Sequence, residues 1–330
     1  AITARIKVLG NMRLDEKRLP QDGRFGVEAG GEKISFRVSI LPVYYGEKIV
    51  MRLLRDNISG FTLEALGFHG SGLEQMHSAM KQTTGLILTT GPTGAGKSTT
   101  LYTLLDLLNT PDVNISTVED PVEYRMIRVN QTQINPKVGM TFAAALRALL
   151  RQDPDIIMVG EIRDQETLEI ALHAAMTGHL VLSTLHTNSA AATLPRMLDM
   201  GAEPFLIAST VNVIIAQRLV RRLCVECRKA YKLDAKEVES LGKLYNLEEI
   251  LTTLKKNPFA KKVVENAARW EDIELYKATG CEQCNNEGYR GRVGVYEVLE
   301  MDTDIRKLVT QAATSEELET QARKNGMETM

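Results

Sequence analysis

The sequence predicts a mixed α/β protein whose larger part is built on a parallel β-sheet. From residue 73 onward, short apolar runs alternate with amphipathic segments of helical period, a pattern typical of α/β folds. A glycine-rich loop at 91–98 lies between one such apolar run and one such helix. The first 56 residues differ, because apolar and polar side chains alternate strictly from Ile34 to Ile40, as in a half-buried strand.

The composition excludes several classes of protein. The 330 residues include 40 Lys and Arg, 42 Asp and Glu, and 44% hydrophobic side chains, which argues against a disordered chain or a disulfide-stapled miniprotein. A net charge of -2 argues against a general nucleic-acid coat, so we expect no nucleic-acid partner. No apolar run approaches the roughly 18 residues of a spanning helix, and the sequence shows no charged start followed by an apolar signal core. We therefore expect a fragment of a cytoplasmic protein, since the chain begins in mid-pattern at Ala1.

The N-terminal module is expected to span residues 1–56. After the alternating strand, a turn at 42–46 leads to a returning strand at 48–54. Residues 1–60 contain 11 Lys and Arg against 7 Asp and Glu, a local charge of +4, so the remaining 270 residues carry -6. Residues 57–72 contain four glycines and little periodicity, which predicts a linker.

The second domain is expected to span residues 73–330. Its predicted strands are 85–90, 114–118, 155–159 and 179–184, and its predicted helices are 97–108, 141–152, 165–177 and 204–219. A cysteine-containing subdomain follows at about 220–294, and a helical tail occupies 295–330. The length agrees with two domains at roughly 100–200 residues each.

The glycine-rich loop predicts a phosphate-binding site. It matches G-x-x-x-x-G-K-[ST] and follows a predicted strand, so its backbone N–H groups would point onto phosphate oxygens at a helix N-terminus. Lys97 would reach the β- and γ-phosphates, and the Ser98 hydroxyl would ligate magnesium. The alternative is a plain glycine-rich turn before a helix. The candidate nucleotide-binding residues are Gly91, Pro92, Thr93, Gly94, Ala95, Gly96, Lys97, Ser98 and Thr99.

Acidic side chains follow two of the predicted strands. Glu161 comes shortly after the apolar run 155–159 and is a candidate magnesium ligand, although Gly160 departs from the common pattern. Glu119, Asp120 and Glu123 follow the strand 114–118, and one of these carboxylates could orient the attacking water. Solvated loop carboxylates are the alternative in each case.

Two of the five histidines flank the predicted strand at 179–184. His186, at its C-terminal end, could donate a hydrogen bond to a γ-phosphate and sense its loss. Alternatively, His179 and His186 are strand-end residues bonded to backbone.

All four cysteines occur in two C-x-x-C pairs. Disulfides are the poorer explanation in a cytosolic protein, and a tetrahedral zinc site is the better one. A redox role for the pairs is the alternative. The 53 residues between the pairs exceed the usual spacing, which predicts an insertion. The candidate zinc ligands are Cys224, Cys227, Cys281 and Cys284.

These motifs together resemble one family, the motor ATPases of type II secretion and type IV pilus assembly. Residues 91–98, 118–123, 155–164 and 177–187 are similar to its Walker A, aspartate, Walker B and histidine boxes. The resemblance extends over the chain, from Arg5-Ile-Lys7 and Gln21-Asp-Gly-Arg24 to the helical tail. It implies a PAS-like N-terminal module and a RecA-like P-loop ATPase core, assembled as a cytoplasmic homohexamer that binds ATP, ADP, magnesium and zinc.

The resemblance also implies roles for individual residues. Glu123 matches the water-activating glutamate, Glu161 the Walker B glutamate and His186 the γ-phosphate contact, while Lys97 and Glu119 complete the candidate catalytic set. In this family the N-terminal module contributes two arginines that contact the bound nucleotide, and Arg37 and Arg52 match them. Weaker candidates for a phosphate contact or an interface are Arg147, Arg151 and Arg163.

The family implies a partner as well, an inner-membrane platform protein that recruits the motor to the membrane surface. The cysteine pairs favour the pilus extension and type II secretion motors over the retraction motor, and the segment 284–292 favours pilus extension, with type II secretion as the alternative. A RecA-like nucleic-acid translocase and a scaffold that binds ATP without hydrolysing it are the competing functions.

Overall fold

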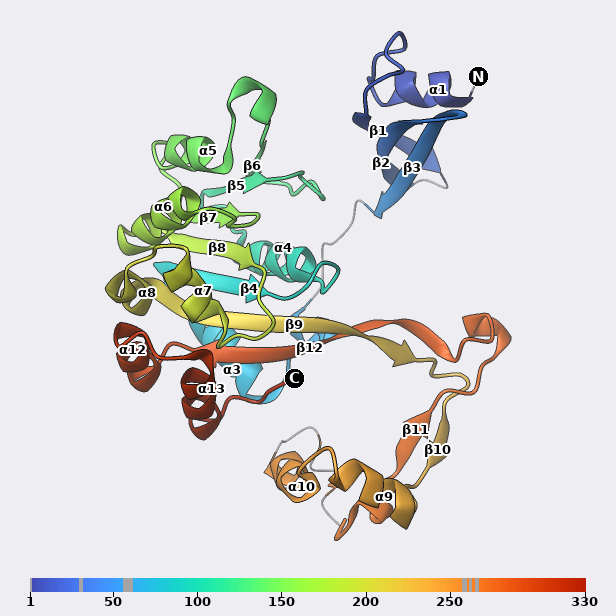
Figure 1. Cartoon of the computed structure of the whole chain (residues 1–330), viewed down its shortest axis with the longest axis vertical. Coiled ribbons are helices and arrows are strands. Elements are labelled where there is room, and N and C mark those ends of the chain that lie inside the picture. The colour runs from blue at the N-terminus through green and yellow to red at the C-terminus, as the bar shows by residue number, and fades with distance from the viewer. Residues whose placement is uncertain (1, 30–31, 56–61, 257–259, 261–262, 265–266) are drawn as a thin grey trace.

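The computed structural model describes residues 2–29, 32–55, 62–256, 260, 263–264 and 267–330. These residues form a three-stranded, a seven-stranded and a two-stranded sheet. Figure 1 shows the large sheet between two layers of helices, with the two-stranded sheet beyond the end of a long hairpin. The mixed α/β fold with a parallel sheet is therefore confirmed.

The N-terminal module is an antiparallel sheet with one helix. Val38 and Ile40 are buried while Ser39 between them is exposed, so the predicted alternation is confirmed. Lys7 of the helix is buried and forms an ion pair with Glu47 at 2.5 Å, which anchors the helix to the sheet. The elements are α1 Ile2–Leu9, β1 Gln21–Ala29, β2 Glu32–Val43 and β3 Gly46–Arg55, with β2 in the centre.

The seven-stranded sheet has the order β12-β9-β4-β8-β7-β5-β6. All neighbours pair in parallel except β12, which is antiparallel to β9. The four predicted strands are confirmed to within one residue. The strands are β4 Gly85–Thr90, β5 Ile115–Glu119, β6 Val129–Gln133, β7 Ile156–Val159, β8 Leu180–Leu185, β9 Val211–Leu223 and β12 Tyr289–Glu300.

Helices cover both faces of this sheet. Side chains of β4 alternate between two cores, with Leu86 and Leu88 in one and Ile87 in the other. The helices on the Ile87 side are α2 Leu63–Leu66, α3 Gly70–Met80 and α4 Lys97–Leu108. Those on the other side are α5 Phe142–Leu149, α6 Gln165–Met176, α7 Thr193–Asp199, α8 Pro204–Thr210, α12 Thr303–Thr310 and α13 Ser315–Lys324; the short η1 Pro136–Val138 precedes α5. Within the described ranges, no helix has the length and apolar character needed to cross a membrane.

The predicted helix at 204–219 is wrong in its second half. The helix α8 ends at Thr210, and the chain continues as the long strand β9 between β4 and β12. Val211, Val213, Ile214 and Ile215 form a β-branched run, which favours a strand buried on both faces. A continuous apolar run has no period that separates such a strand from a buried helix.

Two further segments differ from the sequence prediction. In the predicted linker, residues 57–61 lie outside the described residues, and residues from Leu63 onward form α2 and the start of α3. Leu63 and Phe68 are buried in the core, so this segment is packed structure. In the predicted helical tail, residues 295–300 belong to β12, and the helices begin only at Thr303.

The segment between the cysteine pairs forms a small separate unit, as an insertion should. Its hydrophobic cluster contains Val264, Ala267 and Ile273 and is distinct from the two large cores. The antiparallel strands β10 and β11 join this unit to the cysteines. Its elements are β10 Lys229–Tyr231, α9 Ala235–Gly242, α10 Leu247–Lys256, η2 Trp270–Asp272 and β11 Leu275–Lys277; η3 Glu282–Cys284 follows within the second cysteine pair.

Replacing Gly67 by alanine should destabilise the fold, because Gly67 has a φ of 115° and its added Cβ would lie 2.6 Å from the carbonyl oxygen of Gly294 in β12. Gly178 has the same φ of 115° but open space around it, so Gly178→Ala is the matched control. We expect Gly67→Ala to lower the free energy of unfolding by about 1–3 kcal/mol more than Gly178→Ala in chemical denaturation. Equal losses would show that α2 does not pack closely on β12.

Candidate functional site

The carboxyl ends of β4, β5, β7 and β8 meet at one edge of the large sheet, where the sequence motifs converge. This arrangement follows from the parallel order of the strands. The chain that leaves these strands lines a cleft of about 660 Å³. The predicted residues in its wall are Arg52, Thr93, Gly94, Gly96, Lys97, Ser98, Thr99, Glu119, Glu123, Glu161, Arg163 and His186. Gly91, Pro92, Ala95 and Arg37 do not line it.

The glycine-rich loop curls around the side chain of Lys97. The Lys97 Nζ donates hydrogen bonds to the carbonyl oxygens of Gly91 at 2.8 Å and Pro92 at 3.2 Å. Gly91, Gly94 and Gly96 have φ values of 144°, 80° and 92°, which side chains with a Cβ rarely adopt. The loop therefore has the backbone conformation that a phosphate cradle requires.

Lys97 is buried, with 8% of its surface exposed. This burial lowers the pKa of its ammonium, although the nearby Glu161 carboxylate acts in the opposite direction. A buried cation whose hydrogen bonds go to backbone carbonyls is poorly compensated, so an anion in the cleft would stabilise it. Ser98 and Thr99, at the start of α4, line the same cleft.

Glu161 lies between two cationic or potentially cationic groups. Its Oε1 is 2.5 Å from the Arg163 guanidinium, and its Oε2 is 3.4 Å from Nε2 of His186. The Walker B and histidine segments therefore meet at one carboxylate. His179 is different, because its Nδ1 lies 3.0 Å from the carbonyl oxygen of Ala174 and it does not line the cleft. His179 therefore fits the alternative of a strand-end residue bonded to backbone, whereas His186 lines the cleft beside Glu161.

Glu119 is buried at the base of the cleft, where three donors meet its carboxylate. Thr117 donates to it at 2.5 Å and Gln131 at 3.1 Å, and the Tyr102 hydroxyl donates as well. Burial raises the pKa of Glu119, and these hydrogen bonds oppose that change. Burial and the Glu119 charge also raise the pKa of Tyr102, which therefore stays protonated and acts as a donor. The Glu119 carboxylate is therefore already hydrogen-bonded to three side chains of the protein.

Glu123 occupies the loop after β5 and lines the cleft together with Asp120. Its backbone N–H donates to the Tyr102 hydroxyl at 3.2 Å. Tyr102 therefore connects the buried Glu119 to the backbone of Glu123. This role could not be predicted from the sequence, because Tyr102 is an ordinary aromatic position within α4.

The predicted arginines divide into two groups. Arg52 and Arg163 line the cleft, and Arg37 is the direct cross-strand neighbour of Arg52. Arg147 instead forms an exposed ion pair with Glu166 at 2.5 Å, and Arg151 donates to the Arg147 carbonyl oxygen. Arg147 of α5 and Arg151, which follows that helix, therefore do not line the cleft.

Two further residues of the site were missed by sequence reasoning. Arg292 of β12 lines the cleft, although it is distant in sequence from every nucleotide-binding motif. Gln217 of β9 is buried, and its Nε2 donates to the carbonyl oxygen of Ala95 at 2.8 Å. Both lie on strands whose pairing was not predicted, so no local pattern could have identified them.

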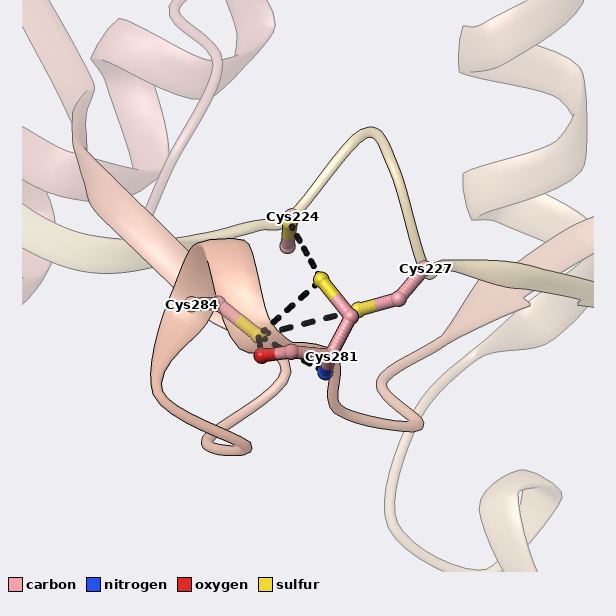
Figure 2. Close-up of side chains that lie close together, drawn as sticks. All are labelled: Cys224, Cys227, Cys281 and Cys284. Carbon is pink, nitrogen blue, oxygen red and sulfur yellow. Dashed lines mark hydrogen bonds between the residues drawn. The ribbon is translucent and has the colours of Figure 1, made fainter.

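The four cysteines form a second candidate site at the end of the β9–β12 hairpin (Figure 2). The Sγ atoms of Cys224 and Cys281 are 3.9 Å apart, those of Cys227 and Cys284 3.8 Å, and those of Cys281 and Cys284 3.7 Å. Four sulfurs placed tetrahedrally at about 2.3 Å from a zinc ion would be about 3.8 Å apart. The cluster therefore fits a zinc ion, and its sulfurs are too far apart for disulfides.

Backbone hydrogen bonds also favour thiolates in this cluster. The N–H groups of Cys281 and Gly288 lie 3.2 and 3.1 Å from Sγ of Cys284. Burial alone would raise the pKa of Cys284, but these hydrogen bonds outweigh it and lower the pKa to about 7. Burial and the contact with Cys284 raise the pKa of Cys281 to about 11. A cation among the sulfurs would favour thiolates at both positions.

Comparisons with known proteins match the whole chain. The family model described as type II/IV secretion system protein matches residues 1–330. The type II secretion system ATPase E of Vibrio cholerae is 45% identical over 318 residues, which are 96% of this chain and 58% of that protein. The type IV pilus assembly ATPase PilB of Pseudomonas aeruginosa is 47% identical over 326 residues, which are 98% of this chain and 54% of that protein. The chain thus spans between half and two thirds of the length of these relatives.

Solved structures share the fold. The pilus retraction motor PilT with bound ADP has a TM-score of 0.60 and 29% identity, and the match covers 95% of this chain and 76% of that one. The ATPase DotB of Legionella pneumophila has a TM-score of 0.60 and 23% identity, covering 93% of this chain and 69% of that one. The α/β core described above is therefore like that of the secretion ATPases.

Replacing Tyr102 by phenylalanine should destabilise the protein by about 1–3 kcal/mol, because a buried carboxylate loses a donor. The loss should be greater at about pH 8 than at about pH 5. The raised pKa of Glu119 means that its ionisation costs stability as the pH rises through that pKa, and the Tyr102 hydrogen bond offsets part of the cost. Chemical denaturation at both pH values measures the effect.

The matched control is Tyr124→Phe, since the Tyr124 ring packs edge-on against Tyr102 at 5.3 Å between ring centroids. We expect this variant to change stability by less than about 0.5 kcal/mol. A Tyr102→Phe loss that did not depend on pH would contradict the assigned role of its hydroxyl.

Proposed function

The chain belongs to the family of type II/IV secretion system proteins, and we propose that it is the core of an ATP-hydrolysing motor that drives type IV pilus assembly. The observation that carries the proposal is the convergence of Lys97, Glu161 and His186 on one cleft. Such a site, with a cradle for phosphates and a carboxylate that follows another strand of the same sheet, suits phosphoryl transfer to water. Relatives named as pilus assembly and type II secretion ATPases support the same activity.

In the proposed site, the loop 91–98 binds the phosphates, and Lys97 compensates their charge. Ser98 and Glu161 would hold a magnesium ion, which supplies charge neutralisation between the phosphates when bound. Ser98 is exposed at the start of α4, and Glu161 lines the same cleft, which supports this assignment. His186, beside Glu161, is placed to contact the terminal phosphate. Arg52 of the N-terminal module adds a cation to the wall of the cleft, and its cross-strand neighbour Arg37 would reach the nucleotide from beside it.

We assign water activation to Glu123 rather than Glu119. The Glu119 oxygens already accept hydrogen bonds from Thr117, Gln131 and Tyr102, and a carboxylate held in this way is a poor base. Glu123 lines the cleft on the loop after β5. Glu119 is then a positioning residue. It binds the Tyr102 hydroxyl, which in turn accepts a hydrogen bond from the backbone N–H of Glu123.

For the cysteine cluster we propose a structural zinc site. The ligand set is Cys₄, the sulfur spacing fits a tetrahedron, and no open coordination position is needed. Its place at the base of the insertion suggests that zinc fixes the exit of this unit from the β9–β12 hairpin.

The wider assembly follows from the family. We propose a cytoplasmic homohexamer that acts on an inner-membrane platform protein and is peripheral to the membrane, with the N-terminal module as a PAS-like domain. The segment 284–292 favours pilus assembly. Type II secretion is the second candidate, because a relative with that name is 45% identical. Growth of pili, or secretion of an exoprotein, in a strain lacking the gene distinguishes the two.

Replacing Lys97 by alanine should lower kcat for ATP hydrolysis by at least about 100-fold, because the phosphates lose their buried cation. Glu123→Gln should also lose turnover while its affinity for ATP remains close to that of the wild type. Steady-state phosphate release and nucleotide titration measure the two quantities. Lys137→Ala, at an exposed position in η1, is the control and should behave as the wild type. Normal turnover by Lys97→Ala would refute the site.

The purified protein should contain one zinc ion per chain, and Cys281→Ser with Cys284→Ser should abolish zinc binding and lower the melting temperature. Glu282→Gln is the control, since Glu282 lies between these cysteines, is exposed and offers no sulfur. Zinc content is measured by mass spectrometry of the metal. Wild-type protein with two disulfides and no zinc would contradict the proposal.

A further inference from the structure

Three arginines form a row across the sheet of the N-terminal module. Arg24 of β1 is directly opposite Arg37 of β2, and Arg37 is directly opposite Arg52 of β3. Side chains at such positions point to the same face with Cβ atoms about 5 Å apart, so these like charges repel one another. Among the described residues, no ion pair involves any of the three. Contacts with anions or with carbonyl oxygens outside the module would therefore relieve the repulsion among these three arginines.

The two ends of the row face different parts of the ATPase core. Arg52 lines the cleft that contains Lys97. Arg24 reaches the loop after β5: its Nη1 donates to the carbonyl oxygen of Val122 at 2.7 Å, and its Nη2 lies 3.4 Å from that of Glu123. Hydrogen bonds from an ionised donor are stronger than neutral ones. These contacts join residues that are 98 and 99 positions apart in the chain.

The backbone of Glu123 is thus held from both sides. Its N–H donates to Tyr102 of the core, whereas its carbonyl oxygen faces Arg24 of the module. The N–H of the preceding Val122 lies 3.4 Å from Oε1 of Gln133, so the core holds residues 122 and 123 through long hydrogen bonds, whereas Gln131 holds the carbonyl oxygen of the next residue, Tyr124, at 2.8 Å. The shortest bond that reaches residues 122 and 123 comes from Arg24.

We propose that Arg24 is a positioning residue that places Glu123 for catalysis only when the N-terminal module lies against the core. The proposal rests on the assignment of water activation to Glu123. On this proposal, Arg52 and Arg37 contact the phosphates of the bound nucleotide. Arg24, on the same sheet, contacts the loop that contains Glu123. One row of arginines therefore makes hydrolysis depend on closure of the module over the nucleotide.

The test compares Arg24→Ala, Arg24→Lys and Arg52→Ala in the full chain, by steady-state ATP hydrolysis and by titration with a fluorescent ATP analogue. Arg24→Ala should lower kcat by about 10- to 100-fold, the effect of misplacing a catalytic group, while KM and the Kd for the analogue change less than about twofold. Arg24→Lys should recover part of kcat, since an ammonium also donates to carbonyls. Arg52→Ala should instead raise KM and Kd, because Arg52 faces the nucleotide.

Arg13→Ala is the matched control, because Arg13 belongs to the same module, is exposed, and within the described ranges its side chain forms an ion pair only with Asp15. It should hydrolyse ATP as the wild type does. Wild-type kcat in Arg24→Ala, or a raised Kd with normal kcat, would overturn the proposal. If Arg24→Ala does not fold, the kcat of Arg24→Lys relative to Arg13→Ala decides. Failure of the proposed function itself is distinguishable, since then the wild type and Lys97→Ala would release phosphate at the same rate.

Discussion

Main-chain hydrogen bonds between β4 and β9 place Gln217 directly behind the glycine-rich loop 91–98, because Gln217 follows the residue that pairs with Thr90. Its amide holds the Ala95 carbonyl at 2.8 Å, and a Cβ on Gly91 would lie 2.6 Å from its backbone oxygen. The strand β9 also pairs with β12, which brings Arg292 to the cleft, and ends one residue before Cys224. The loop, the far wall of the cleft and the cysteine cluster all depend on this one strand.

Much of the fold was predictable because its signals are local. The strand at 85–90 and the helix at 97–108 were predicted to the residue, since a loop of fixed pattern separates them. Strand β9 was not, because a β-branched run after a helix start at Pro204 has no period of its own. Its structure is determined by pairing with β4 and β12, and both of these strands are distant from β9 in the sequence.

Some residues of the candidate site could likewise be predicted from local sequence signals, and others could not. Lys97, Glu161 and His186 were predicted from motifs, because each follows a strand whose carboxyl end must face the same edge of the sheet. Tyr102 and Arg292 were not, because their roles depend on contacts between elements that are distant in sequence. Glu119 was predicted as one acidic residue among three, and only its burial and its three donors separate it from Glu123.

Cations and carboxylates reach the cleft from different elements. Lys97 comes from the start of α4, Arg52 from the N-terminal module and Arg292 from β12, while Glu119 ends β5 and Glu161 follows β7. Burial already lowers the pKa of Lys97, so a phosphate beside it would relieve the cost of a poorly compensated charge. The basic module can add to that stabilisation only when it lies against the acidic core. On the proposed function, nucleotide binding and closure of the module would therefore be coupled by the same charges, whose sum of -2 over the whole sequence gives no hint of the separation.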